Sequence, residues 1–150
     1  MLFPITAFAQ AYVQTWDLVD SGKHLDYDGN STYMSYINTG AATWNAYKSG
    51  VIRKDSAFVV EDVYVSDVNA SNGWAGMTYS SGKIELNTYY MSGYSNSKKQ
   101  NVATPELGHA SGLDHSTSTD VMDAAITGHT STQALSQNDK DSYDAAYNNY

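Results

Sequence analysis

Apolar side chains recur at helical spacing early in the chain, between a polar segment and a glycine. The recurring residues lie three or four positions apart, which places them on one face of a helix: Tyr33, Ile37, Ala41 and Trp44, with Tyr47 or Lys48 at the end. Residues 30–32 precede the pattern as a candidate helix cap, and Gly50 follows it as a stop signal. The sequence therefore predicts a first long helix that packs an aromatic face inward.

The hydrophobic pattern changes to that of strands in the middle of the chain. Residues 57–65 are rich in Val, Phe and Tyr and predict a strand, with a bend at the acidic pair 61–62. Residues 73–79 and 83–86 predict two more strands on either side of a tight turn at 80–82. Apolar and polar residues alternate in the last of these strands, so we expect one of its faces to contact solvent.

Two further helical segments follow the strands. Residues 96–112 predict a second long helix, and residues 135–147 predict a third, with Ser136 as its N-cap and acids in its first turn. The order is helix, strands, helix, irregular segment and helix. This order is typical of a single α+β domain with one mixed, twisted sheet, two long helices and a C-terminal helix.

Length and composition restrict the kinds of protein that fit. A chain of 150 residues suits one domain and can bury a core without disulfides, which the absence of cysteine excludes. The 16 acidic and 8 basic residues give a net charge of −8, which repels phosphate backbones and argues against nucleic-acid binding. No stretch approaches the roughly 18 apolar residues that a membrane span requires.

The N-terminal segment 1–11 admits two interpretations. It is apolar and carries alanines at the spacing of a signal-peptide cleavage site, which fits the remnant of an export signal. It lacks a basic start and the length of a full signal, which fits an apolar segment docked on the domain equally well. We expect residues 12–150 to form the folded domain.

Residues with catalytic chemistry gather in the segment 105–115. Positions four apart on a helix share a face, so side chains at 105 and 109 point the same way, and Glu106 lies beside that face. Gly112 allows the chain to leave the helix through a left-handed turn that brings His115 back towards His109. Imidazoles that converge in this way are typical zinc ligands, and an adjacent carboxylate can act on a zinc-bound water.

The same residues resemble the metzincin motif H-E-x-x-H-x-x-G-x-x-H. Glu106, His109, Gly112 and His115 match its defined positions, whereas Pro105 stands where the first histidine belongs. The resemblance is to the matrixins, the matrix-metalloprotease branch of the metzincins, and is closest to their secreted bacterial members. It covers most of the chain and implies a metzincin-like catalytic domain.

Features outside the motif extend the resemblance. Met122 and its neighbours resemble the Met-turn, whose methionine would form an apolar floor beneath the metal. Residues 135–139 resemble the start of the family's C-terminal helix. Residues 73–79 resemble the family's edge strand, where an extended substrate would be bound by Gly73, Trp74, Ala75, Gly76 and Met77. An amphipathic helix with incidental histidines would explain the motif but none of these features.

Pro105 permits two different starts for the second long helix. A start at Thr104 would place proline at the first helical position, where it is favourable. A start near Ser97 would place it in the interior, where it removes a backbone hydrogen bond and costs about 3 kcal/mol. We expect the longer helix with a kink at the proline, because Val102 and Ala103 continue its apolar face.

Pro105 also leaves the zinc site without one of its three ligands, because its side chain has no donor atom. Four side chains are alternative ligands, although none has the family's spacing: Asp114, Asp120, Asp123 and His129. We interpret His24 and His129 as surface histidines, too few for a second zinc site. A calcium site among the carboxylates is an open alternative, although no loop motif marks it.

The resemblance implies a secreted, zinc-dependent endopeptidase that hydrolyses internal peptide bonds of proteins and is impaired by Pro105. Glu106 would be the catalytic base, and His109 and His115 would hold one zinc ion that is weakly bound or lost. The expected partners are protein or peptide substrates, and the domain is expected to be a monomer. The alternative hypothesis is a pseudoprotease that binds extended peptides without metal.

Overall fold

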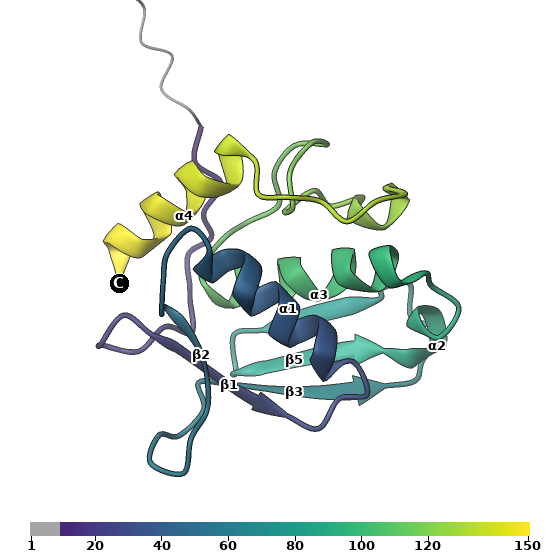
Figure 1. Ribbon diagram of the computed structural model, residues 1–150, viewed down its shortest axis with the longest axis horizontal. Helices are drawn as coiled ribbons and strands as arrows, with labels where there is room; N and C mark the ends of the chain where they lie inside the picture. Colours follow the sequence, from purple (N-terminus) through teal and green to yellow (C-terminus); the bar gives the residue numbers. More distant parts are fainter. Residues whose placement is uncertain (1–9) are drawn as a thin grey trace, which may run out of the picture.

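The computed structural model describes residues 10–150, so residues 1–9, on which the export-signal hypothesis rests, lie outside the described part of the chain. The strands in this part are β1 (Leu25–Gly29), β2 (Ile52–Lys54), β3 (Val63–Val68), β4 (Gly76–Tyr79) and β5 (Lys83–Asn87). They form one sheet in the order β2-β1-β3-β5-β4 (Figure 1). All neighbours pair in parallel except β4, which pairs antiparallel with β5 at one edge.

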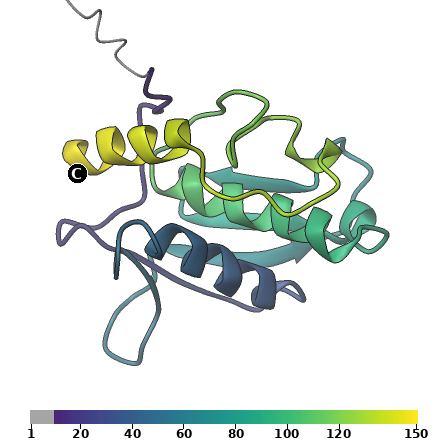
Figure 2. The ribbon, with the colours of Figure 1, turned by 45° about the horizontal axis from the view of Figure 1, so that its top comes forward.

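The described helices are α1 (Met34–Asn45), α2 (Thr88–Met91), α3 (Asn96–Ala110), the 3₁₀-helix η1 (Ile126–Gly128) and α4 (Gln137–Asn149). The long helices α1 and α3 lie side by side on the same face of the sheet (Figure 1 and Figure 2). Helix α4 packs near the end of α1, where the rings of Trp44 and Tyr143 meet edge to face at 5.3 Å. This arrangement confirms the predicted α+β domain with a mixed sheet, two long helices and a C-terminal helix.

Alternating side chains of the central strands build the core. The apolar residues of β3 and β5 that have no exposed surface are two positions apart within each strand: Val63, Val65, Ile84 and Leu86. Trp44 of α1 belongs to the same hydrophobic cluster, and its indole N–H donates to the Thr104 carbonyl at 2.9 Å. This hydrogen bond fixes α3, the helix that carries the motif, against α1.

The predicted strand over residues 57–65 is wrong in its boundaries. Phe58 and Val60 are 98% and 83% exposed in the loop between β2 and β3, and β3 begins only at Val63. The strand-like composition of the loop is not matched by a neighbouring strand. Pairing starts at Asp62, whose N–H donates to the Asp26 carbonyl and whose carboxylate accepts the Asp26 N–H. The strands β1 and β2 were not predicted.

The helix predictions agree better with the structure. Helix α3 is continuous from Asn96 through Pro105, and the Ser95 hydroxyl caps it by accepting the Lys98 N–H. The longer of the two predicted helices is therefore confirmed. Ser136 is the N-cap of α4, as predicted. The predicted cap at 30–32 is wrong, because α1 begins after Tyr33 with no side-chain capping bond. No helix within residues 10–150 combines the length and apolar character needed to cross a bilayer.

Candidate active site

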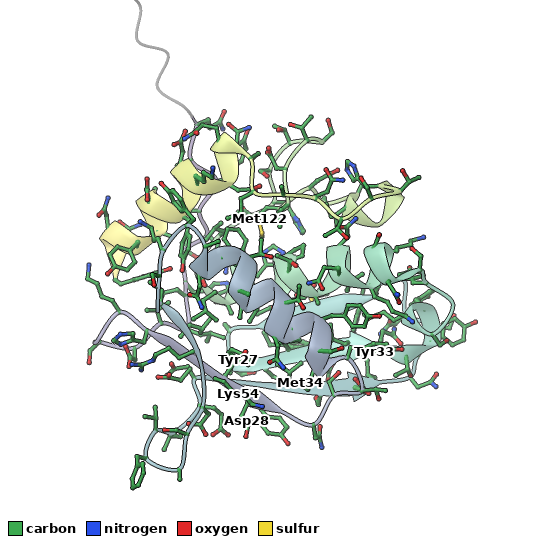
Figure 3. The ribbon with its side chains drawn as sticks, in the orientation of Figure 1. Tyr27, Asp28, Tyr33, Met34, Lys54 and Met122 are labelled. Carbon is green, nitrogen blue, oxygen red and sulfur yellow. The ribbon has the colours of Figure 1, made fainter. Side chains whose placement is uncertain are left out.

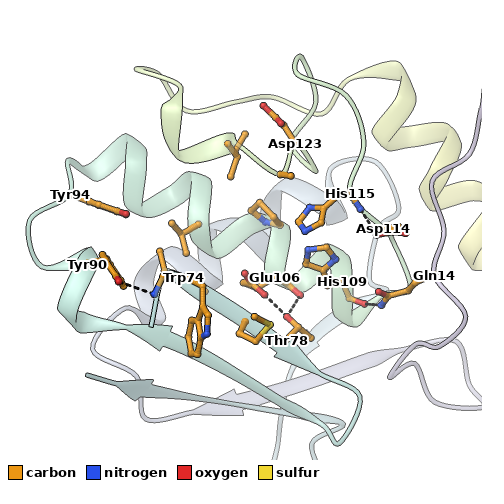
Figure 4. A pocket seen from close by; sticks show the side chains of 18 of the residues that line it. Gln14, Trp74, Thr78, Tyr90, Tyr94, Glu106, His109, Asp114, His115 and Asp123 are labelled. Carbon is orange, nitrogen blue, oxygen red and sulfur yellow. Dashed lines mark hydrogen bonds between the residues drawn. The ribbon is translucent and has the colours of Figure 1, made fainter. Parts of the chain in front are cut away.

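A cleft of about 520 Å³ lies between the edge strand β4 and helix α3 (Figure 4). Residues 73–78 form one wall, and α3 forms another with Pro105, Glu106 and His109. The segment after α3 closes the cleft with His115 and further residues up to Ile126. The structure thus brings the predicted catalytic, metal-binding and edge-strand residues to one cavity.

Glu106 enters the cleft from α3 and is only 7% exposed. The Thr78 hydroxyl of β4 donates to its Oε2 at 2.6 Å (Figure 4). Burial raises the pKa of Glu106 from its ordinary 4.5 to about 7, although the Thr78 hydrogen bond and the nearby His115 oppose this rise. A carboxylate with such a pKa can accept and release a proton near neutral pH.

The two imidazoles of the motif face each other. The ring centroids of His109 and His115 are 4.6 Å apart. His109 Nδ1 lies 2.9 Å from the Leu113 carbonyl, and His115 Nδ1 lies 3.4 Å from the Met122 carbonyl. A carbonyl only accepts, so these contacts assign the proton to Nδ1 and leave each Nε2 lone pair free for a metal. Burial also lowers the pKa of His109, which favours the neutral ring.

A helix-ending turn places His115 beside His109. Gly112 has a φ of +88°, the left-handed conformation that glycine adopts without strain. Its N–H donates to the His109 carbonyl, and the Leu113 N–H donates to the Gly108 carbonyl. This pair of bonds is the Schellman pattern, in which the chain reverses at once after the helix. The predicted left-handed turn at Gly112 is confirmed.

Met122 lies in the core rather than at the surface. It is 1% exposed, and its thioether points towards α3 (Figure 3), where a Cβ added at Gly108 would lie 2.4 Å from its Sδ. Asp139 of α4 holds this segment, because its carboxylate accepts the main-chain N–H groups of Val121 at 2.8 Å and Met122 at 3.2 Å. This role of Asp139 was not predicted from the sequence. The S-x-x-D spacing after Ser136 was the available signal, since Asp139 also completes a capping box.

Position 105 faces the cleft, as its spacing from His109 predicts, but carries a buried proline ring. Within residues 10–150, the only group of three or more potential ligands close enough for one ion lies elsewhere, at Asp20, Asp26 and Asp62. The cleft therefore presents two imidazoles and no third ligand in place. The donor set does not fit a complete three-ligand zinc site.

The side chains considered as substitute ligands have other partners. Asp114 accepts the His115 N–H at 2.7 Å, and Asp120 accepts two hydrogen bonds from Thr117. Asp123 lines the cleft, but its Oδ2 lies 2.9 Å from His129 Nε2. The His129 side chain is partly exposed and is paired with Asp123 rather than aimed at the two imidazoles.

None of the clustered residues Asp20, Asp26 and Asp62 lines the cleft, and the negative charge of the cluster is already neutralised in part. Asp26 is its most buried member, and both of its carboxylate oxygens accept hydrogen bonds from Arg53, at 2.8 and 2.7 Å. This bidentate pair provides the counter-charge that a calcium ion would otherwise supply. The expectation of a calcium site gains no support from this cluster.

Comparisons with known proteins agree with the motif. The family model described as Matrixin matches residues 7–148 of the chain. Among proteins with curated functional descriptions, the search found no match. A solved structure described as the GM1-bound form of the ECX AB5 holotoxin superposes with a TM-score of 0.49 at 16% identity, over 71% of this chain and 59% of that chain. A likeness of this size carries no argument about function.

Proposed function

Because the chain belongs to the matrixin family of metallopeptidases, we propose that it hydrolyses internal peptide bonds of proteins and that Pro105 impairs this activity. The observation that best supports the proposal is the convergence of Glu106, His109 and His115 on one cleft beside β4. The family's members typically act outside the cell. The proposal therefore includes secretion, with residues 12–150 as a monomeric catalytic domain.

The substrate would bind as an added strand along β4. Within residues 10–150, β4 pairs with β5 alone and forms one edge of the sheet, so its outer edge can offer main-chain donors and acceptors to a substrate. Gly73, Trp74, Ala75, Gly76 and Met77 line the cleft along this edge. Main-chain pairing of this kind accepts many sequences, which suits a protein substrate in extended form.

Glu106 would serve as general base and then as general acid. With a pKa of about 7, its carboxylate can take a proton from an attacking water and later give that proton to the departing amine. Burial in the cleft strengthens this exchange, because fewer waters compete for the proton. A positioned general base contributes about 10²- to 10⁴-fold to the rate.

Pro105 is the reason for expecting impaired activity. Zinc is the metal that the family implies, and only His109 and His115 are in place for it. Loss of a partner that merely orients a ligand lowers metal affinity or activity about 10–100-fold, and loss of a ligand should lower affinity further. The same observation favours the second candidate function, a pseudoprotease that binds extended peptides without metal.

Three proteins separate these functions: the natural chain, Pro105→His and Pro105→Ala. Zinc content is measured by mass spectrometry and proteolysis by casein cleavage. We expect one zinc per chain and strong cleavage only in Pro105→His, because position 105 faces the cleft. Pro105→Ala is the matched control, since it restores the helix hydrogen bond without adding a ligand. Pro105→His combined with Glu106→Gln should bind zinc but not cleave.

The outcomes discriminate clearly. Equal, negligible cleavage by the natural chain and Pro105→His would defeat the peptidase proposal and favour the peptide-binding alternative. Cleavage by both proteins, with zinc in both, would show that a group other than position 105 completes the site. Recovery in Pro105→Ala would instead show that the proline acts through the helix backbone.

A further inference from the structure

Two residues of β4 touch the two oxygens of the Glu106 carboxylate. Gly76 and Thr78 are two positions apart, so they lie on the same face of the strand. A Cβ added at Gly76 would lie 2.6 Å from Glu106 Oε1 and 2.9 Å from a methyl carbon of Val102. The Thr78 hydroxyl contacts Oε2 at 2.6 Å. Strand β4 thus leaves space for Oε1 at Gly76 and binds Oε2 through Thr78.

The Thr78 hydroxyl has a second acceptor within reach. Its oxygen lies 3.0 Å from the main-chain carbonyl of Glu106, in addition to the side-chain contact. When Glu106 is ionised, the hydroxyl donates its proton to Oε2. When Glu106 is protonated on Oε1, Oε2 remains an acceptor, so the hydroxyl can keep donating to Oε2 or turn its proton to the main-chain carbonyl. Thr78 therefore has a satisfied arrangement for both states of Glu106.

We propose that Thr78 is a positioning residue for Glu106, which holds Oε2 against the edge strand and leaves Oε1 as the oxygen that exchanges the proton. The inference rests on the proposed peptidase function. Thr78 keeps its own proton throughout, and the proton that Glu106 takes up and releases binds at Oε1, outside the hydrogen bond to Thr78. The same contact links the strand that would bind substrate to the residue that would act on it.

Two physical arguments favour this role over a purely structural one. The contact at 2.6 Å is as short as charge-assisted O–H···O⁻ bonds are. Glu106 is also almost fully buried, so few waters can replace the hydroxyl if it is removed. A valine at position 78 keeps the shape of threonine but offers neither a donor nor an acceptor, whereas serine keeps both.

The test compares Thr78→Val and Thr78→Ser in the Pro105→His protein, which has the complete ligand set. The measurements are kcat and KM for a quenched peptide, zinc content and the melting temperature. We expect Thr78→Val to lower kcat about 10–100-fold, the range found when an orienting partner is lost, with KM within about twofold. The kcat of Thr78→Ser should stay within about threefold of the parent value, because serine keeps the hydroxyl group that orients the carboxylate. Zinc content should be unchanged in both.

Two controls make the result specific to Glu106. In a protein that already carries Glu106→Gln, adding Thr78→Val should lower the residual rate no further. Gly76→Ala should lower kcat like Thr78→Val, because its methyl group would displace Oε1. If Thr78→Val leaves kcat unchanged, or raises KM while kcat stays constant, the inference is overturned and the peptidase proposal stands. If the Pro105→His parent itself is inactive, the peptidase proposal and the positioning role of Thr78 are both refuted, and the assay of the parent is enough to show this.

Discussion

Replacing Glu106 with glutamine should stabilise the metal-free protein at neutral and alkaline pH. Glutamine keeps the size of the side chain and an acceptor for the Thr78 hydroxyl, but it cannot ionise. The natural carboxylate is 7% exposed, and burial raises its pKa to about 7 from the 4.5 expected in the unfolded chain. The folded state therefore binds a proton more tightly than the unfolded state does.

The sign and size of the effect follow from this difference. Because the pKa of Glu106 is raised on folding, its contribution to stability is fully present below about pH 4.5 and is lost as the pH rises to about 7. A pKa of about 7 in place of 4.5 corresponds to about 3 kcal/mol of unfolding free energy at most. Glu106→Gln removes this loss, so the two proteins should differ little at pH 4 and by about 2–3 kcal/mol at pH 8.

Urea unfolding of both proteins at pH 4, 6 and 8, after removal of metal with a chelator, measures the difference. Subtracting the two curves cancels the titration of groups that both proteins share, including His109 and the other buried acids. Thr78→Val alone is a useful control, because it removes the hydrogen bond but keeps the ionisable group. A difference that does not change between pH 4 and pH 8 would refute the argument that burial perturbs Glu106.

Three further substitutions test other parts of the fold by thermal or urea unfolding. Gly108→Ala should destabilise the fold by about 1–3 kcal/mol, because its methyl group would lie 2.4 Å from Met122 Sδ; an unchanged melting temperature would show that Met122 moves freely. Asp139→Ala should lower the free energy of unfolding by at least about 2 kcal/mol, because it leaves the buried main-chain N–H groups of Val121 and Met122 unpaired. A decrease below about 0.5 kcal/mol would show that water replaces the carboxylate as acceptor. Arg53→Met should lower the free energy of unfolding by up to about 3 kcal/mol, because it leaves the buried carboxylate of Asp26 without its partner. An unchanged free energy of unfolding would mean that solvent screens this carboxylate.

Local signals in the sequence were sufficient for the helices and for the core of the site. The apolar positions before Pro105 and the Ser136 cap of α4 act within a few residues, and the structure places these helices as predicted. The spacing from Glu106 to His115 also works locally, because a helix and the turn at Gly112 fix it. Such signals need no knowledge of distant contacts.

Features that depend on distant partners were not predicted. The strand-like loop around Phe58 has no strand to pair with, and nothing in its own composition reveals this. Thr78 meets Glu106 across 28 positions in the sequence, and Asp139 meets Val121 across 18. Asp123 pairs with a nearby histidine, but only the path of the loop decides that pairing. These contacts follow from the fold as a whole.

The anchoring of Met122 by Asp139 has a consequence for the order in which the site forms. A growing chain acquires Glu106 and both imidazoles well before it acquires Asp139, the residue that ties down the segment below them. A nascent chain that stops short of α4 would therefore carry the reactive side chains without a fixed support. If the proposed hydrolytic activity is correct, it should therefore appear only after synthesis has passed this aspartate.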